Sequence, residues 1–131
     1  MKIFTLLCVI LLSHLPLTLS AQDTADIQFR NKEIKLGEVP STGKSYLLNY
    51  IFTNTGKKPL VIFRVKASCG CVKVKSWPKA PVMPQKQDTI KVLFSPHSQK
   101  GHFSKSLLVD TNTSKGSYII RFNGTVNKKT K

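Results

Sequence analysis

Acidic residues are scarce in this chain. The sequence has six aspartates and glutamates against 21 lysines and arginines, which gives a formal net charge of +15 at pH 7. None of the acids has a partner at a spacing suited to general acid–base catalysis; they are Asp23, Asp26, Glu33, Glu38, Asp88 and Asp110. Nucleophile-elbow and phosphate-loop motifs are also missing. These absences predict a protein that is not an enzyme and that has no cofactor.

Long apolar runs are missing too. The only sustained one, residues 3–12, follows Lys2 and precedes the small residues Ser20 and Ala21. It falls short of the ~20 residues that a membrane-spanning helix needs, and its layout is that of a cleaved secretory signal. We therefore expect a signal peptide at 1–21 and a single exported domain at 22–131, with no membrane span in the mature chain and a periplasmic or extracellular location.

The excess of positive charge is spread along the whole chain rather than gathered in one run. Such a charge favours weak binding of polyanions, and a solvated basic surface is its simplest interpretation. Nucleic acid is not an expected partner, because the protein is predicted to be exported. Another protein of the cell envelope is the partner that we expect.

Helical periodicity is absent, and a period of two takes its place. Apolar side chains alternate with polar ones in segments rich in β-branched and aromatic residues, separated by turns such as 54–59, 95–101 and 111–116. The residues expected to face inward are Tyr46, Leu48, Tyr50 and Phe52; Val61, Phe63, Val65 and Ala67; Ile90, Val92 and Phe94; Phe103, Leu107 and Val109; and Tyr118, Ile120, Phe122 and Val126. With a shorter strand at 34–39, the pattern predicts an all-β fold, a single immunoglobulin-like β-sandwich of about seven strands. A small barrel is the alternative.

Three prolines, Pro78, Pro81 and Pro84, lie three residues apart in the segment "WPKAPVMP". Proline cannot donate to a sheet, so the segment is predicted to be a sheet edge or a connector between the two sheets. Trp77 is the expected packing anchor of this connector.

A set of motifs covers nearly all of the predicted mature chain. The matching residues are Phe52, Asn54, Gly56, Pro59, Ser68, Cys69, Gly70, Cys71, Pro81, Pro84, Phe94, Gly101, Phe103, Lys105, Asn112, Gly124 and Val126. In this arrangement the chain resembles an uncharacterised bacterial family, the domain of unknown function 1573. That family is similar to the Hydin-like group of immunoglobulin folds, so the resemblance implies an interaction module.

One motif departs from the family pattern. Where the family usually reads Pro-Gly-Glu, this chain has Pro84-Gln85-Lys86. The chain therefore offers no glycine to a turn at this place, and it carries a positive charge at a position that is usually acidic.

Cysteine is rare, and its placement is unusual. Of three cysteines, Cys8 lies in the predicted signal, and the other two, Cys69 and Cys71, surround Gly70. The inward-facing parity of the strand changes between Cys69 and Val72, which predicts a bulge or tight turn at Gly70. Such a kink brings the two cysteines closer than the roughly 6.6 Å between alternate residues of a straight strand.

Three interpretations of this pair stay open. The cysteines are two small buried residues, or a labile disulfide or reactive thiol pair favoured by Lys66 and Lys73. The third is a metal site in which Cys69 and Cys71 are joined by His97 and His102; this spacing is only a weak signal.

The hypothesis that follows is an exported, non-enzymatic binding or accessory module of the bacterial cell envelope. Its loops or edge strands are expected to contact another envelope protein. The alternative is a thiol-active protein that uses Cys69 and Cys71 in redox exchange.

Overall fold

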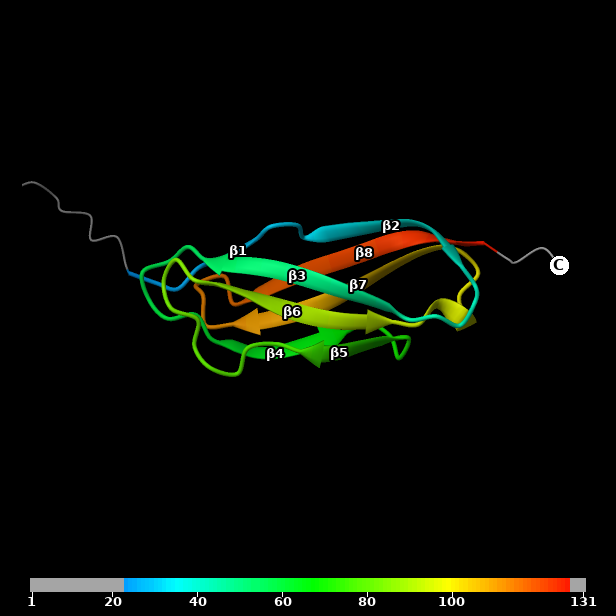
Figure 1. The fold of residues 1–131 in the computed structure, drawn as a ribbon. Coiled ribbons are helices and arrows are strands. Elements are labelled where there is room, and N and C mark those ends of the chain that lie inside the picture. Colours follow the sequence, from blue (N-terminus) through cyan, green and yellow to red (C-terminus); the bar gives the residue numbers. More distant parts are fainter. Residues whose placement is uncertain (1–22, 128–131) are drawn as a thin grey trace, which may run out of the picture.

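The computed structural model describes residues 23–127, and the predicted signal peptide lies outside the described residues. Two four-stranded sheets stack face to face, with β3 and β6 in one layer and β7 and β8 in the other (Figure 1). The predicted fold class, an all-β sandwich, is confirmed. In the described part of the chain, no helix has the length and apolar character of a membrane span.

The strand bounds are β1 (Ile27–Phe29), β2 (Glu33–Pro40), β3 (Tyr46–Asn54), β4 (Ile62–Ala67), β5 (Val72–Ser76), β6 (Gln87–Phe94), β7 (Gly101–Thr111) and β8 (Ser117–Asn127). A short 3₁₀ helix, η2 (Pro96–Ser98), separates β6 from β7. The first sheet has the order β1-β3-β6-β5 and the second the order β2-β8-β7-β4. The pairs are antiparallel except for β2 and β8, which run parallel. The strand that the sequence pattern does not reveal is β1, whose three residues are too few to show alternation.

The core lies between the two sheets and is built by alternation along the long strands. Every second residue of β3 and β8, and of β6 from Ile90 onward, is buried or half-buried against the opposite sheet, as predicted. Phe94 of β6 contacts two rings of the other sheet, with ring centroids 4.8 Å from Phe103 and 4.9 Å from Phe122. These aromatic contacts join the layers through apolar burial.

The prediction for β4 is partly wrong. Val65 is buried and Ala67 packs against the core, but Phe63, expected inward, is 63% exposed, and Ile62 is buried in its place. The pairing of β4 with β7 shifts between Ile62 and Arg64, which marks a bulge. One extra residue at a bulge reverses the side-chain parity on the N-terminal side, and this turns Phe63 toward solvent.

The proline-rich segment joins the edge strand β5 to β6, its neighbour in the same sheet, so of the two predicted roles the passage between sheets is wrong. Leu60 and Val82 exchange two backbone hydrogen bonds of 2.8 Å, which fix the connector against the start of β4. Trp77 is half-buried and packs against the core, as expected of an anchor.

One buried hydroxyl links the two sheets. The Tyr50 hydroxyl, on β3, donates a 2.8 Å hydrogen bond to the backbone carbonyl of Arg121 on β8. Burial raises the pKa of the Tyr50 phenol far above its usual range, so the group stays protonated and remains a donor. The hydrogen bond also satisfies a polar atom of a fully buried side chain.

Asn54, at the end of β3, organises three loops although it is fully buried. Its amide nitrogen donates to the carbonyls of Lys58 (2.8 Å) and Val82 (2.9 Å), and its oxygen accepts from the N–H of Gly56 (2.9 Å). A side chain at Gly56 would collide with the backbone of Thr24, so the loop closes only around a glycine. This collision explains the glycine of the sequence "NTG", which starts at Asn54, the last residue of β3.

Replacing Asn54 by Ala removes these hydrogen bonds and leaves buried backbone groups unpaired. We expect the free energy of unfolding to fall by about 3 kcal/mol, measured by urea denaturation. The matched control is Asn49→Ala on the same strand, where the side chain is exposed, and the expected change is below about 0.5 kcal/mol. Equal effects of the two substitutions would contradict the role of Asn54.

The Pro84-Gln85-Lys86 motif forms a tight turn without a glycine. The N–H of Lys86 donates to the carbonyl of Met83 (3.1 Å), and Gln85 has a φ of 66°. This is the geometry of a type II turn with proline at its second position, in which the third position favours glycine. Gln85 therefore holds a left-handed backbone conformation that disfavours a side chain.

We expect Gln85→Gly to stabilise the domain by about 0.5–1 kcal/mol, because relief of the left-handed conformation outweighs the added freedom of the unfolded chain. Lys86→Gly is the control and should destabilise by a similar amount, since Lys86 has no positive φ. Urea denaturation of both variants is the measurement, and a destabilising Gln85→Gly would disprove the argument.

Candidate functional site

The cysteine pair lies where the chain crosses from one sheet to the other. β4 ends at Ala67 in the second sheet, and β5 begins at Val72 in the first. The four residues between them form a tight turn that is closed by a 3.3 Å hydrogen bond from the N–H of Val72 to the carbonyl of Cys69. The predicted change of parity at Gly70 is thus confirmed as a turn.

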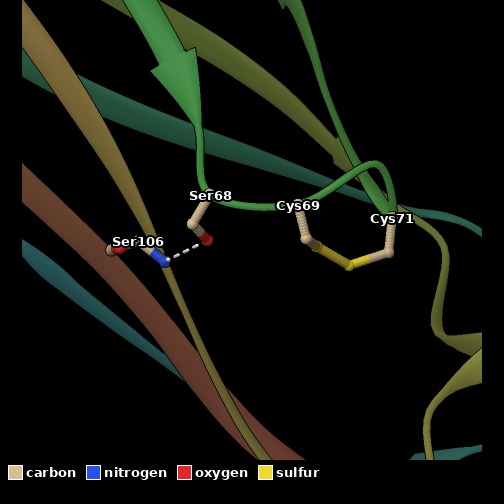
Figure 2. The surroundings of a disulfide bond; sticks show 4 residues. All are labelled: Ser68, Cys69, Cys71 and Ser106. Carbon is tan, nitrogen blue, oxygen red and sulfur yellow. Dashed lines mark hydrogen bonds between the residues drawn. A yellow bond between two sulfur atoms is a disulfide. The ribbon is translucent and has the colours of Figure 1, made fainter.

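Hydrogen bonds anchor both sides of this turn. On the β4 side, Ser68 and Ser106 of β7 exchange two bonds: the Ser68 N–H donates to the Ser106 carbonyl (3.0 Å), and the Ser106 N–H donates to the Ser68 hydroxyl (3.2 Å; Figure 2). On the other side, the N–H of Ser95, which follows β6, donates to the carbonyl of Cys71 (3.0 Å). The turn is therefore attached to both sheets.

The two sulfurs are joined in a disulfide whose side chains lie on the same side of the turn (Figure 2). The Cα atoms are 5.4 Å apart, within the range that a disulfide needs and shorter than the roughly 6.6 Å of a straight strand. Both cysteines are half-buried and pack against the core. The bond closes a ring of only three residues, so it adds little constraint to the unfolded chain.

A shallow depression of about 350 Å³ lies beside the disulfide. It is lined by Gly70, Cys71, Lys73, Ser95 and His97. Lys73 is exposed, so it can bring a positive charge toward the sulfurs. A positive charge of this kind stabilises a thiolate when the disulfide is reduced.

The four candidate metal ligands do not come together. His97 is in the depression with Cys71, but His102 lies on β7, opposite Thr125 of β8, and does not line the depression. No group of three or more His, Cys, Asp or Glu residues able to hold a metal occurs within residues 23–127. The structure places the histidines on different elements because β7 turns into the second sheet after η2.

A second hollow, of about 380 Å³, runs beside the first half of β8 and is called here the β8 groove. Its lining residues are Lys32, Glu33, Lys115, Ser117, Tyr118, Ile119 and Arg121. Sequence reasoning missed this group, because its members come from both ends of the chain. Only the sheet order brings the segment around Lys32 next to β8.

Residues 27–126 match a family model described as Protein of unknown function (DUF1573). The chain belongs to the DUF1573 family. The resemblance predicted from Ser68, Cys69, Gly70, Cys71 and the other matching residues is therefore confirmed. The comparison with curated proteins found no match for this DUF1573 chain.

Solved structures share the fold of this DUF1573 domain at low sequence identity. A protein of unknown function from Porphyromonas gingivalis W83 has a TM-score of 0.69 at 13% identity, over 82% of this chain and 50% of the other. The VesB protease of Vibrio cholerae has a TM-score of 0.59 at 12% identity, over 79% and 31%. The YadV chaperone has a TM-score of 0.53 at 15% identity, over 80% and 53%. The chain thus spans about half or less of each of these proteins, and the likeness concerns the fold alone.

Removal of the disulfide should leave the sandwich folded. For residues 22–131, we expect no free thiol without reductant and two with it. The variant with both Cys69→Ser and Cys71→Ser should lose only about 1–2 kcal/mol of unfolding free energy, because the ring is so small. Thiol titration counts the free thiols, and urea denaturation measures the unfolding free energy. The double variant in reductant is the control for effects of the reductant itself, because it has no disulfide to reduce. Two free thiols in the oxidised protein would contradict the disulfide.

Proposed function

We propose that this DUF1573 domain is an exported, non-enzymatic binding module of the bacterial cell envelope that contacts another envelope protein through its strand edges. The supporting observation is that the sheets have open edges and that the charged residues of the chain are mostly positive. Strands β1, β5, β2 and β4 end the two sheets, and the chain as a whole carries a net charge of +15.

An open strand edge offers unpaired backbone groups to any extended chain, including a second copy of the same domain. Lysines on the edge work against pairing between identical copies. β5 has Lys73 and Lys75, and both are exposed. Like charges repel the second copy, while an acidic partner is attracted to the same surface. The domain is thus suited to pair with a different protein that carries negative charge.

The test is capture from an envelope extract of the producing cells by immobilised residues 22–131 at physiological salt. We expect one or a few envelope proteins to be retained, identified by mass spectrometry and then confirmed as purified proteins in a direct binding measurement. Electrostatic complementarity predicts that binding weakens as salt is raised.

An unrelated protein of similar positive charge, immobilised in the same way, separates specific capture from ion exchange. If the immobilised control protein retains the same proteins as the immobilised domain, this result counts against the proposal. So would recovery of the full-length protein from the cytosolic fraction alone, because the proposed partners lie in the envelope.

The disulfide favours a second candidate, thiol–disulfide exchange. A dithiol of another exported protein would be oxidised to a disulfide while the Cys69–Cys71 bond is reduced to two thiols. The half-buried sulfurs beside Lys73 and His97 are its support. The thiol titration discriminates between the candidates: exchange requires that the two thiols react readily in the folded, reduced protein, whereas a structural pair stays inert.

A further inference from the structure

Strand β8 lies inside its sheet, yet four of its eleven residues lack a neighbour on one side. β2 pairs with β8 from Glu33 opposite Arg121 to Pro40 opposite Asn127. Before Glu33 the chain has moved to the other sheet, where the N–H of Arg30 donates to the carbonyl of Ile51 on β3 (2.9 Å). Within residues 23–127, no strand therefore pairs with residues 117–120 on the side away from β7.

The backbone of Ile119 points into this gap. In an antiparallel pair, residues alternate between those whose N–H and C=O face the neighbour and those whose groups face away. The N–H of Arg121 donates to the carbonyl of Lys32 (2.7 Å), away from β7. Ile119 is two residues earlier and opposes Leu108 of β7, so its N–H and C=O face the same open side. The N–H and the C=O of Ile119 are thus available as one donor and one acceptor for hydrogen bonds to an added strand.

The β8 groove lies in this gap, and three of its four charged lining residues are basic. The ammonium nitrogens of Lys115 and Lys32 lie 5.0 Å and 5.8 Å from the ring centroid of Tyr118, which holds both cations beside the open edge. Arg121 is exposed at the end of the gap. The single acid of the groove, Glu33, accepts a hydrogen bond from the side-chain amide of Asn123.

The groove cations have no acidic partner in the described part of the chain. Among residues 23–127, the ion pairs are Lys57 with Asp23 and Arg64 with Asp110. The three positive charges of the groove are therefore available to a ligand. An apolar surface accompanies them, because the side chain of Ile119 is 50% exposed.

We propose that the β8 groove binds an extended acidic segment of a partner polypeptide, which adds as a strand to the unpaired edge of β8. The proposal rests on the proposed function as a binding module and names its site. A polypeptide is the favoured ligand because the gap presents a backbone donor and acceptor, which an extended main chain matches. Acidic side chains match Lys32, Lys115 and Arg121. The open edge from Ser117 to Ile120 accommodates about four residues of strand.

The experiment uses residues 22–131 and a capped peptide of about seven residues that alternates Glu and Val. We expect binding at low salt, with slower amide hydrogen exchange at Ile119, measured by NMR. The matched control peptide has the same sequence with every second amide N-methylated, so that it keeps its charge but loses its donors. Equal binding of the two peptides would overturn strand addition.

Two pairs of charge reversals locate the site. Lys115→Glu with Arg121→Glu should weaken peptide binding about tenfold or more. Lys44→Glu with Lys91→Glu makes the same change in net charge at exposed positions away from the groove and should weaken it less than about threefold. Urea denaturation of both variants checks that the fold is kept. Equal weakening by the two pairs would overturn the site.

Heparin is the test for binding of polyanions in general. If heparin binds as tightly as the peptide, and the amide exchange of Ile119 is unchanged by either, the groove is only a charged surface and the proposal is wrong. The absence of any peptide binding at low salt has the same consequence.

The capture experiment separates this proposal from the proposed function. If the wild-type domain retains an envelope protein and the Lys115→Glu, Arg121→Glu variant retains it equally, the domain is a binding module that uses another surface. If the wild-type domain retains nothing, the proposed function itself fails, whatever the peptide does.

Discussion

Burial of the inner faces of the two sheets against each other is the constraint on which the rest of the structure depends. The contact of Phe94 with Phe103 and Phe122 removes large apolar surfaces from water and holds the layers together. A buried interior requires that every enclosed polar group be paired. Asn54 and Tyr50 meet this requirement where loops and strands pass close to the core. Between β1 and β8 the chain changes sheets five times: after β1, β2, β3 and β6, and at the cysteine turn between β4 and β5.

Much of the fold is readable from the sequence because the long strands repeat apolar residues with a period of two. β3 and β8 alternate over nine or more residues and β6 over its last six, enough to define their inner faces. β1 has three residues and no readable period. Phe63 is misassigned because the bulge in β4 adds a residue whose presence depends on the pairing with β7. Such pairing is decided by the fold and has no local signature.

The two candidate sites differ in the same way. The cysteine turn is encoded within a few residues, since the parity changes between Cys69 and Val72 and this change predicts the turn. The β8 groove joins Lys32 to Lys115, and only the parallel pairing of β2 with β8 brings them together. The turn at Gln85 is an intermediate case: the proline signals it, but the left-handed glutamine has no counterpart in turn preferences.

The parallel pairing of β2 and β8 also has a mechanical consequence. Tension applied to the chain before β2 and after β8 would pull the two strands past each other along their length. All their hydrogen bonds would then be loaded at once in shear, instead of opening one after another as in an unzipping hairpin. The short pairing of β1 with β3 would yield first and transfer the load to this clamp. The pairing of β2 with β8 is therefore the part of this sheet that resists such a pull most strongly.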